Sequence, residues 1–135
     1  MSIATATPYL FLGGRAEEAI GAYTEALDAE VTSLQRFGDM DDGCPEAIRN
    51  RVMHASLQLG DALLFLSDGP DGVPSQPGNV SVALSLDDPK ETQRYFQALA
   101  ASGEIIEHLF EAPWGALFGV VQDEFGISWM FNCQL

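Results

Sequence analysis

The chain has 135 residues, 47% of them hydrophobic, and its 20 acidic against 6 basic residues give a formal net charge of −14. This length allows one well-buried core and is too short for two ordinary domains, so we expect a single domain over residues 1–135. The negative charge would repel a phosphate backbone, which argues against nucleic acid as a partner. Because the sequence lacks both an apolar run of about 20 residues and a signal-peptide pattern, we expect a cytoplasmic protein without a membrane partner. Cys44 and Cys133 lack metal-type spacing and are expected to be free thiols.

The first half of the chain predicts a strand, a helix and three further strands. Apolar residues recur on one face of the helix, and Gly13-Gly14 provides the turn that leads into it. Gly60-Asp61 joins the last two strands as a short hairpin, whereas residues 38–45 carry turn-forming and acidic residues and predict a mobile loop. The expected elements are a strand at 7–12, a helix at about 15–29 and strands at 30–37, 51–59 and 62–67.

The second half repeats this order after a linker at residues 68–79, which is rich in glycine and proline. Asp87 or Asp88 is expected to cap a helix that has Pro89 in its first turn and that ends near Gly103. The expected elements are a strand at 80–86, a helix from about 89 to 102 and strands at 105–110, 116–122 and 127–133.

A short repeat indicates that the chain is one module written twice. The segment Tyr23–Ala29 (YTEALDA) returns in the second half as Tyr95–Ala101 (YFQALAA), at the same place in the predicted helix. We therefore expect an α+β fold in which two βαβββ modules, at about residues 1–68 and 79–135, form a curved mixed sheet.

Side-chain alternation gives each predicted strand two different faces. Ala55 and Leu57 lie on the apolar face that a helix would cover, whereas His54, Ser56 and Gln58 lie on the opposite face. We expect the second faces of the two modules to curl into a concave cleft with the mixed character of a small-ligand site; the alternative is a sheet face exposed to water. The residues expected along this cleft are His54, Ser56, Gln58, Phe65, Ser81, Ser85, Ser128, Met130 and Asn132.

Four stretches of the sequence resemble one known family. They are YLFLGGRAEEAIGAYTEAL at 9–27, MHA at 53–55 leading into LQLGDALLFLSDG, PWG at 113–115 and DEFGISW at 123–129. With the duplicated layout they resemble the vicinal oxygen chelate superfamily of glyoxalases, bleomycin-resistance proteins and extradiol dioxygenases. Within it they are similar to the PhnB-like branch, also labelled 3-demethylubiquinone 3-methyltransferase-like. The resemblance spans nearly the whole chain and implies the superfamily fold and a homodimer.

The resemblance also implies a position for a metal. Superfamily enzymes typically hold a divalent ion with four His, Gln or Glu side chains, two from each module. The aligned positions in this chain are Pro8, Phe65, Ser81 and Met130. None of these is a ligand for a hard or borderline divalent ion, and moving the alignment by one residue supplies no imidazole or carboxylate. We therefore expect no metal cofactor, although a metal held by relocated ligands such as His54 and Gln58 stays open.

His54 is the candidate catalytic residue, because a neutral imidazole can accept or donate a proton near neutral pH; the alternative is a structural hydrogen-bonding role. Trp114 follows a proline in a loop at the expected mouth of the cleft, where it could stack on a flat ligand. Trp129 is expected in the core and His108 on the surface. The candidate ligand-binding residues are Ser56, Gln58, Phe65, Ser81, Trp114 and Met130.

Together these features predict a PhnB-like glyoxalase-fold protein that binds a small, largely apolar molecule in its cleft, as a homodimer and without a catalytic metal. Two alternatives stay open. One is an enzyme, either a metal-dependent lyase or isomerase of the same superfamily with relocated ligands or the transferase that the family label implies. The other is a structural dimer module whose cleft is collapsed.

Overall fold

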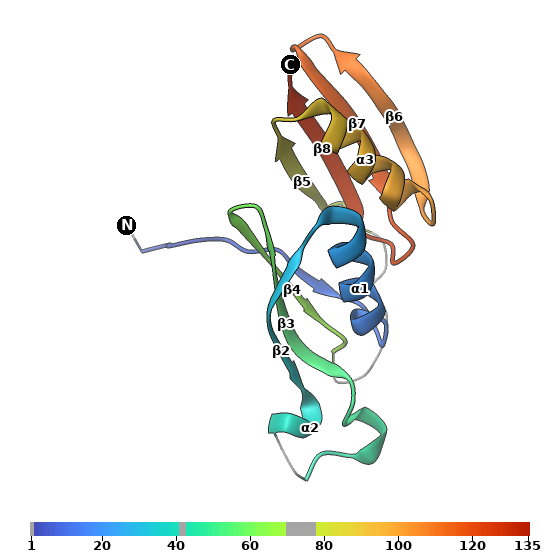
Figure 1. Ribbon diagram of the computed structural model, residues 1–135. Coiled ribbons are helices and arrows are strands. Elements are labelled where there is room, and N and C mark those ends of the chain that lie inside the picture. Colours follow the sequence, from blue (N-terminus) through green and yellow to red (C-terminus); the bar gives the residue numbers. More distant parts are fainter. Residues whose placement is uncertain (1, 41–42, 70–77) are drawn as a thin grey trace. The chain divides into compact units, whose positions relative to one another are not determined.

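A computed structural model describes residues 2–40, 43–69 and 78–135 of the chain (Figure 1). Contacts between residues divide the chain into two compact units, Met1–Ser75 and Gln76–Leu135. Most of the linker predicted at 68–79 lies outside the described residues. In the described part of the chain, no helix is both long and apolar enough to cross a membrane.

The first unit is a four-stranded sheet with one long helix. The strand order is β1-β4-β3-β2, in which β1 and β4 are parallel and the other neighbours are antiparallel. The main elements are β1 (Tyr9–Phe11), α1 (Ala16–Leu27), β2 (Glu30–Arg36), β3 (Val52–Leu59) and β4 (Ala62–Ser67).

The segment after β2 differs from the mobile loop predicted at 38–45. It begins with the short helix α2 (Phe37–Met40), and a 3₁₀ turn (Glu46–Ile48) precedes β3. Two contacts support this local structure: the Asp39 carboxylate accepts from the backbone N–H of Arg36 at 3.0 Å, and the N–H of Gly38 donates to a backbone carbonyl at 3.0 Å. Residues 41–42 of the predicted loop lie outside the described part.

The second unit repeats the plan of the first. Its strand order is β5-β8-β7-β6, again with one parallel pair, β5 and β8. The elements are β5 (Ser81–Leu86), α3 (Pro89–Ala100), β6 (Glu104–Ala112), β7 (Ala116–Gln122) and β8 (Ser128–Gln134). The predicted α+β fold of two βαβββ modules is confirmed, but each module forms a sheet of its own rather than part of one sheet.

The helix ends follow local capping chemistry. Asp88, rather than Asp87, caps α3: its carboxylate accepts from the backbone N–H of Lys90 at 2.9 Å and of Glu91 at 3.4 Å. Helix α1 ends at Leu27, two residues before the predicted end, because Asp28 adopts a left-handed conformation with φ of 56°.

One face of each sheet is covered by the helix of its unit (Figure 1). Ala55 and Leu57 are fully buried, as are Trp129 and Phe131. In the second unit Phe96 of α3 meets Phe131 edge to face, with ring centroids 5.4 Å apart. The predicted assignment of these strand residues to the helix side is confirmed, and the alternating residues point to the opposite face of each sheet.

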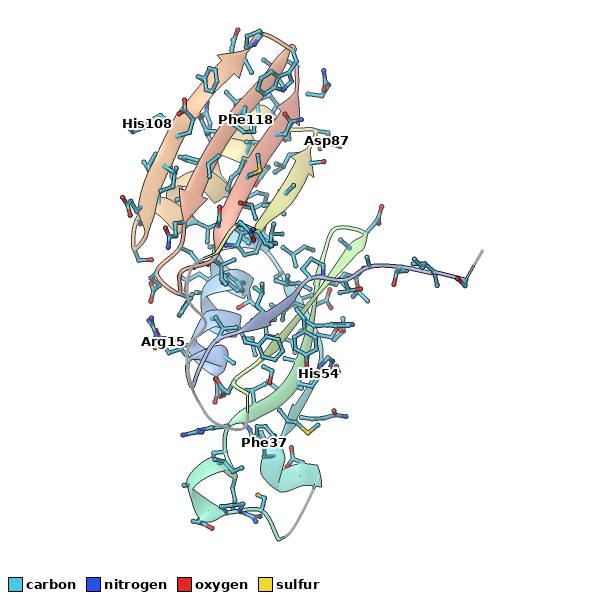
Figure 2. The ribbon with its side chains drawn as sticks, turned by 180° about the vertical axis from the view of Figure 1, so that it is seen from behind. Arg15, Phe37, His54, Asp87, His108 and Phe118 are labelled. Carbon is cyan, nitrogen blue, oxygen red and sulfur yellow. The ribbon has the colours of Figure 1, made fainter. Side chains whose placement is uncertain are left out.

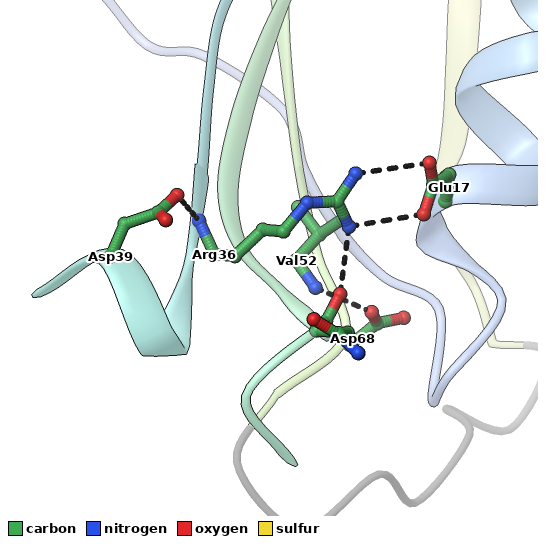
Figure 3. Close-up of polar contacts among 6 residues, drawn as sticks. Glu17, Arg36, Asp39, Val52 and Asp68 are labelled. Carbon is green, nitrogen blue, oxygen red and sulfur yellow. Dashed lines mark hydrogen bonds and ion pairs between the residues drawn. The ribbon is translucent and has the colours of Figure 1, made fainter. Parts of the chain in front are cut away.

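Polar contacts fix the start of α1 against the first sheet (Figure 3). The buried carboxylate of Asp68 accepts from the backbone N–H of Ala16 and of Val52, both at 2.8 Å. The Arg36 guanidinium donates to both carboxylate oxygens of Glu17 at 3.0 Å, and this hydrogen-bonded pair lowers the pKa of the Glu17 carboxyl. Because Glu17 is exposed, its ion pair adds little to stability, and the buried Asp68 contributes more.

Replacing Asp68 by Asn should lower the free energy of unfolding by about 1–3 kcal/mol, because one backbone N–H would then face an amide N–H instead of a carboxylate oxygen. The measurement is urea unfolding at pH 7, followed by far-ultraviolet circular dichroism. Asp61→Asn is the matched control, since Asp61 is exposed at the hairpin turn, and it should change the free energy by less than about 0.5 kcal/mol. Equal losses in the two variants would contradict this role of Asp68.

Candidate functional site

The open face of the first sheet, the face opposite α1, brings predicted site residues of β3 and β4 together with Tyr9 of β1. The register places Tyr9 of β1 and Ser56 of β3 on either side of Phe65 of β4, so the three side chains point to the same face. His54 lies two residues before Ser56 on β3 and therefore shares this face. Figure 2 labels His54 on the first sheet, seen from behind the view of Figure 1.

Four side chains with rings contact one another on this open face. We call Tyr9, Phe11, His54 and Phe65 the first ring cluster. Tyr9 stacks on Phe11 with ring centroids 4.9 Å apart, and His54 meets Phe65 edge to face at 4.9 Å. Tyr9 also meets His54 at 5.5 Å and Phe65 at 5.6 Å. Tyr9 and Phe11 are 41% and 48% exposed, so the cluster is packed internally and still presents apolar surface.

A hydrogen bond joins two members of the first ring cluster. The phenol oxygen of Tyr9 lies 2.8 Å from Nδ1 of His54. Partial burial raises the pKa of the Tyr9 phenol, so the phenol keeps its proton at neutral pH. Because Nδ1 is hydrogen-bonded to Tyr9, Nε2 is the ring nitrogen of His54 that can form a hydrogen bond with a ligand.

The other predicted residues of the first unit are Ser56 and Gln58. Ser56 is on the open face but only 6% exposed. Gln58 is exposed, and its side-chain amide donates to the carbonyl oxygen of Gly60 at 3.1 Å, at the hairpin turn. The structure therefore groups His54 with Phe65 and directs the Gln58 amide toward the turn.

The open face of the second sheet carries small and polar side chains from β5 and β8. Ser81 is paired with Ser128, and their hydroxyl oxygens lie 2.7 Å apart. Met130 is half-buried and pairs with Ala83 on the same face. Ser81 and Met130 are the two positions of the second module that align with metal ligands of the superfamily. They share a face of the sheet but are not paired with each other.

Trp114 lies in the turn between β6 and β7 and is 56% exposed. Its indole N–H donates to the side-chain oxygen of Asn132 at 3.0 Å, and its ring meets Phe118 edge to face at 5.4 Å. Phe118 in turn meets Phe110 at 6.2 Å. We call Trp114, Phe118 and Phe110 the second ring cluster; its exposed indole is held in one orientation.

Several predictions on single residues are confirmed. Trp129 is fully buried, and its indole N–H donates to the Asp123 carboxylate at 2.9 Å. His108 is exposed on β6, and both cysteines are free. Tyr9 and Phe11 were not predicted as site residues, although their alternation with the apolar residues Leu10 and Leu12 was a signal that could have identified them.

The family model described as 3-demethylubiquinone-9 3-methyltransferase matches residues 4–131. The chain belongs to this family. Protein YjdN of Escherichia coli (strain K12) is 31% identical over 137 residues, an alignment that covers 93% of this chain and 92% of YjdN.

Solved structures agree with this family. PA1353 from Pseudomonas aeruginosa is 32% identical, with 98% of each chain covered and a TM-score of 0.85. A PhnB protein from Bacillus cereus is 27% identical, with 96% of this chain and 99% of that one covered and a TM-score of 0.76. A glyoxalase-related enzyme from Fulvimarina pelagi, 18% identical over 97% of this chain and 88% of that one, shares the fold with a TM-score of 0.65. The PhnB-like branch of the vicinal oxygen chelate superfamily is confirmed.

The residues of this PhnB-like chain do not fit the divalent metal that the superfamily implies. Across the two parallel strand pairs, the open faces carry Tyr9 opposite Phe65 and Ser81 opposite Ser128. Tyr9, rather than the Pro8 expected from the alignment, stands opposite Phe65. Neutral phenol, phenyl and hydroxyl groups are poor ligands for hard or borderline divalent ions. Within residues 2–40, 43–69 and 78–135, no group of three or more His, Cys, Asp or Glu side chains could hold a metal ion.

Replacing Asn132 by Ala should release the Trp114 indole, because the hydrogen bond that orients it is lost. The tryptophan bands of the near-ultraviolet circular dichroism spectrum should weaken toward the spectrum of Trp114→Phe, which identifies the contribution of this side chain. Ser85→Ala is the control, since Ser85 is the exposed pairing partner of Asn132 on β5. An unchanged spectrum in Asn132→Ala would show that the contact does not orient the indole.

Proposed function

We propose that this PhnB-like protein binds a small, largely apolar and flat molecule against the open face of its first sheet, without the divalent metal of the superfamily. The observation that carries the proposal is the first ring cluster. Three aromatic rings and an imidazole stand where strands β1, β3 and β4 meet, and two of the rings are more than 40% exposed. An exposed apolar group with a polar atom at its centre is typical of a ligand site.

The members of the site have separate roles in this proposal. The rings of Tyr9, Phe11 and Phe65 supply apolar contact, and His54 supplies a hydrogen bond through Nε2. His54 is also the residue that would move a proton to or from the ligand, if the bound molecule is transformed. Phe65 contacts the His54 ring, so a ligand that packs on Phe65 would lie beside the imidazole.

The second unit carries a separate flat surface that we also propose for ligand binding. The Trp114 indole is exposed and oriented by Asn132, so it can stack on a planar ligand without first losing side-chain freedom. Ser81 and Met130 line the same open face. Ser56 and Gln58 are the proposed polar residues at the border of the first site. The cleft that would join both faces stays a prediction, as does the cytoplasmic location.

Binding can be measured with N-phenyl-1-naphthylamine, a neutral aromatic probe whose emission rises in apolar surroundings. The wild type should bind it, and Phe65→Ala should weaken binding about tenfold, because one aromatic contact and its buried area are lost. Phe37→Ala is the matched control: Phe37 is half-buried on α2, outside the ring cluster (Figure 2). Equal weakening in the two variants, or no binding by the wild type, would contradict the proposed site.

Metal analysis of the same tag-free protein separates this proposal from the enzymatic alternative. We expect the number of metal ions per chain to be far below one, and we expect no thermal stabilisation of the wild type by Mn²⁺, Ni²⁺ or Zn²⁺. One tightly held ion per chain, with a stabilisation that disappears in His54→Ala, would instead favour a lyase or isomerase with relocated ligands.

We also propose that the protein is a homodimer. Strand β6 forms one edge of the second sheet, and its Ile106 and Phe110 are 54% and 40% exposed. An uncovered edge with exposed apolar side chains favours pairing with another chain. Sedimentation equilibrium should give twice the chain mass of 14.6 kDa, with a dimer that tightens as added salt screens the charge of −14 on each chain. A mass of one chain at every salt concentration would contradict the dimer.

A further inference from the structure

We propose that Tyr9 is a positioning residue that holds His54 in the tautomer with its proton on Nε2, so that the open face of the first sheet presents an N–H donor framed by aromatic rings. The inference rests on the proposed function and adds a ligand class to it. That class is a flat, neutral molecule with an acceptor oxygen, such as the carbonyl of an aromatic ketone.

The direction of the hydrogen bond follows from the chemistry of its two groups. A phenol O–H is a good donor, and the lone pair of a neutral imidazole nitrogen is a good acceptor. The two atoms lie 2.8 Å apart, within the usual range for such a bond. Partial burial raises the pKa of Tyr9, so the phenol proton is present for donation at neutral pH. If Nδ1 accepts, the proton of the neutral ring is on Nε2.

The orientation of the ring is fixed by contacts on more than one side. Tyr9 from β1 and Phe65 from β4 both meet the imidazole edge to face, at 5.5 Å and 4.9 Å between centroids. On the other side of β3, the residue that pairs with His54 is Gln35 of β2, which carries no charge. The imidazole therefore has one ring nitrogen assigned to the protein and one for a ligand.

The ligand class follows from this donor and its surroundings. Phe11 and Phe65 offer ring surface to a flat molecule, and Nε2–H offers a bond to an oxygen acceptor. A hydrocarbon of the same shape would leave the N–H without an acceptor on binding, which costs free energy. A site built to hydrogen-bond one group discriminates against the analogue that lacks it.

The tautomer can be read without any ligand from ¹⁵N chemical shifts of the histidine side chains, at a pH where the imidazoles are neutral. In the wild type, Nδ1 of His54 should have the shift of an unprotonated nitrogen and Nε2 that of a protonated one. In Tyr9→Phe, which keeps the ring and loses the hydroxyl, the two shifts should move toward each other as both tautomers become populated. His108, exposed on β6 of the second unit, is the internal control and should not change.

A second measurement tests the ligand class with acetophenone and ethylbenzene, which have nearly the same shape and differ in the carbonyl oxygen. The ratio of the ethylbenzene to the acetophenone dissociation constant, followed by chemical-shift changes at the backbone amides of Phe11 and Phe65, should fall about two- to tenfold in His54→Phe through loss of one hydrogen bond. Tyr9→Phe should change the ratio in the same direction by a smaller factor.

The two measurements separate the possible failures. A wild-type His54 with its proton on Nδ1, or a tautomer unchanged in Tyr9→Phe, would overturn the positioning role of Tyr9 whatever the protein binds. A ratio unchanged in His54→Phe would overturn the ligand class. If neither probe shifts the residues of the first ring cluster while the tautomer is as expected, the proposed binding function is overturned and the positioning role is supported.

Discussion

A single helix can cover only one face of a four-stranded sheet, and in both units this constraint decides where the candidate site residues lie. Strand residues alternate, so the side chains that pack beneath α1 or α3 leave their neighbours pointing to the other side. Fully burying an apolar side chain such as Leu57 or Phe131 stabilises the fold by about 1.5–3 kcal/mol. A register slip of one residue would exchange the two faces and lose this burial along a whole strand. The residues of the open faces are therefore held in place by the burial of the residues that alternate with them.

Much of the fold could be predicted from the sequence because it depends on local patterns. Alternation identified Ala55 and Leu57 as residues of the covered face of β3. The sequence Asp87-Asp88-Pro89 predicted the N-cap of α3. Alternation could single out Tyr9 and Phe11, but it could not show that Tyr9 meets His54 and Phe65. Tyr9 and Phe65 meet through a parallel pairing of strands that are far apart in the sequence, and no local pattern fixes the register of such a pair. For the same reason the sequence did not distinguish one continuous sheet from two.

The contacts of single side chains were the least predictable part. Gln58 lies on the predicted face, but its amide is hydrogen-bonded at the hairpin turn, which depends on a side-chain conformation rather than on strand position. The sequence could place Trp114 in a turn. Its hydrogen bond to Asn132 could not be predicted, because it depends on the pairing of β7 with β8. In both units a hydrogen bond to a polar neighbour orients a ring on the open face: Tyr9 with His54, and Trp114 with Asn132. The duplicated module has thus kept a common plan while its ring chemistry has diverged.

The positions of the two tryptophans have a practical consequence for studying how the protein unfolds. The chain has two tryptophans, and both belong to the second unit. The first unit contains only Tyr9 and Tyr23 as weaker fluorophores, of which Tyr23 is fully buried beneath the sheet. Intrinsic indole emission therefore comes only from side chains of Gln76–Leu135. A difference between the emission transition and the loss of secondary structure would reveal whether the duplicated halves unfold together or one at a time.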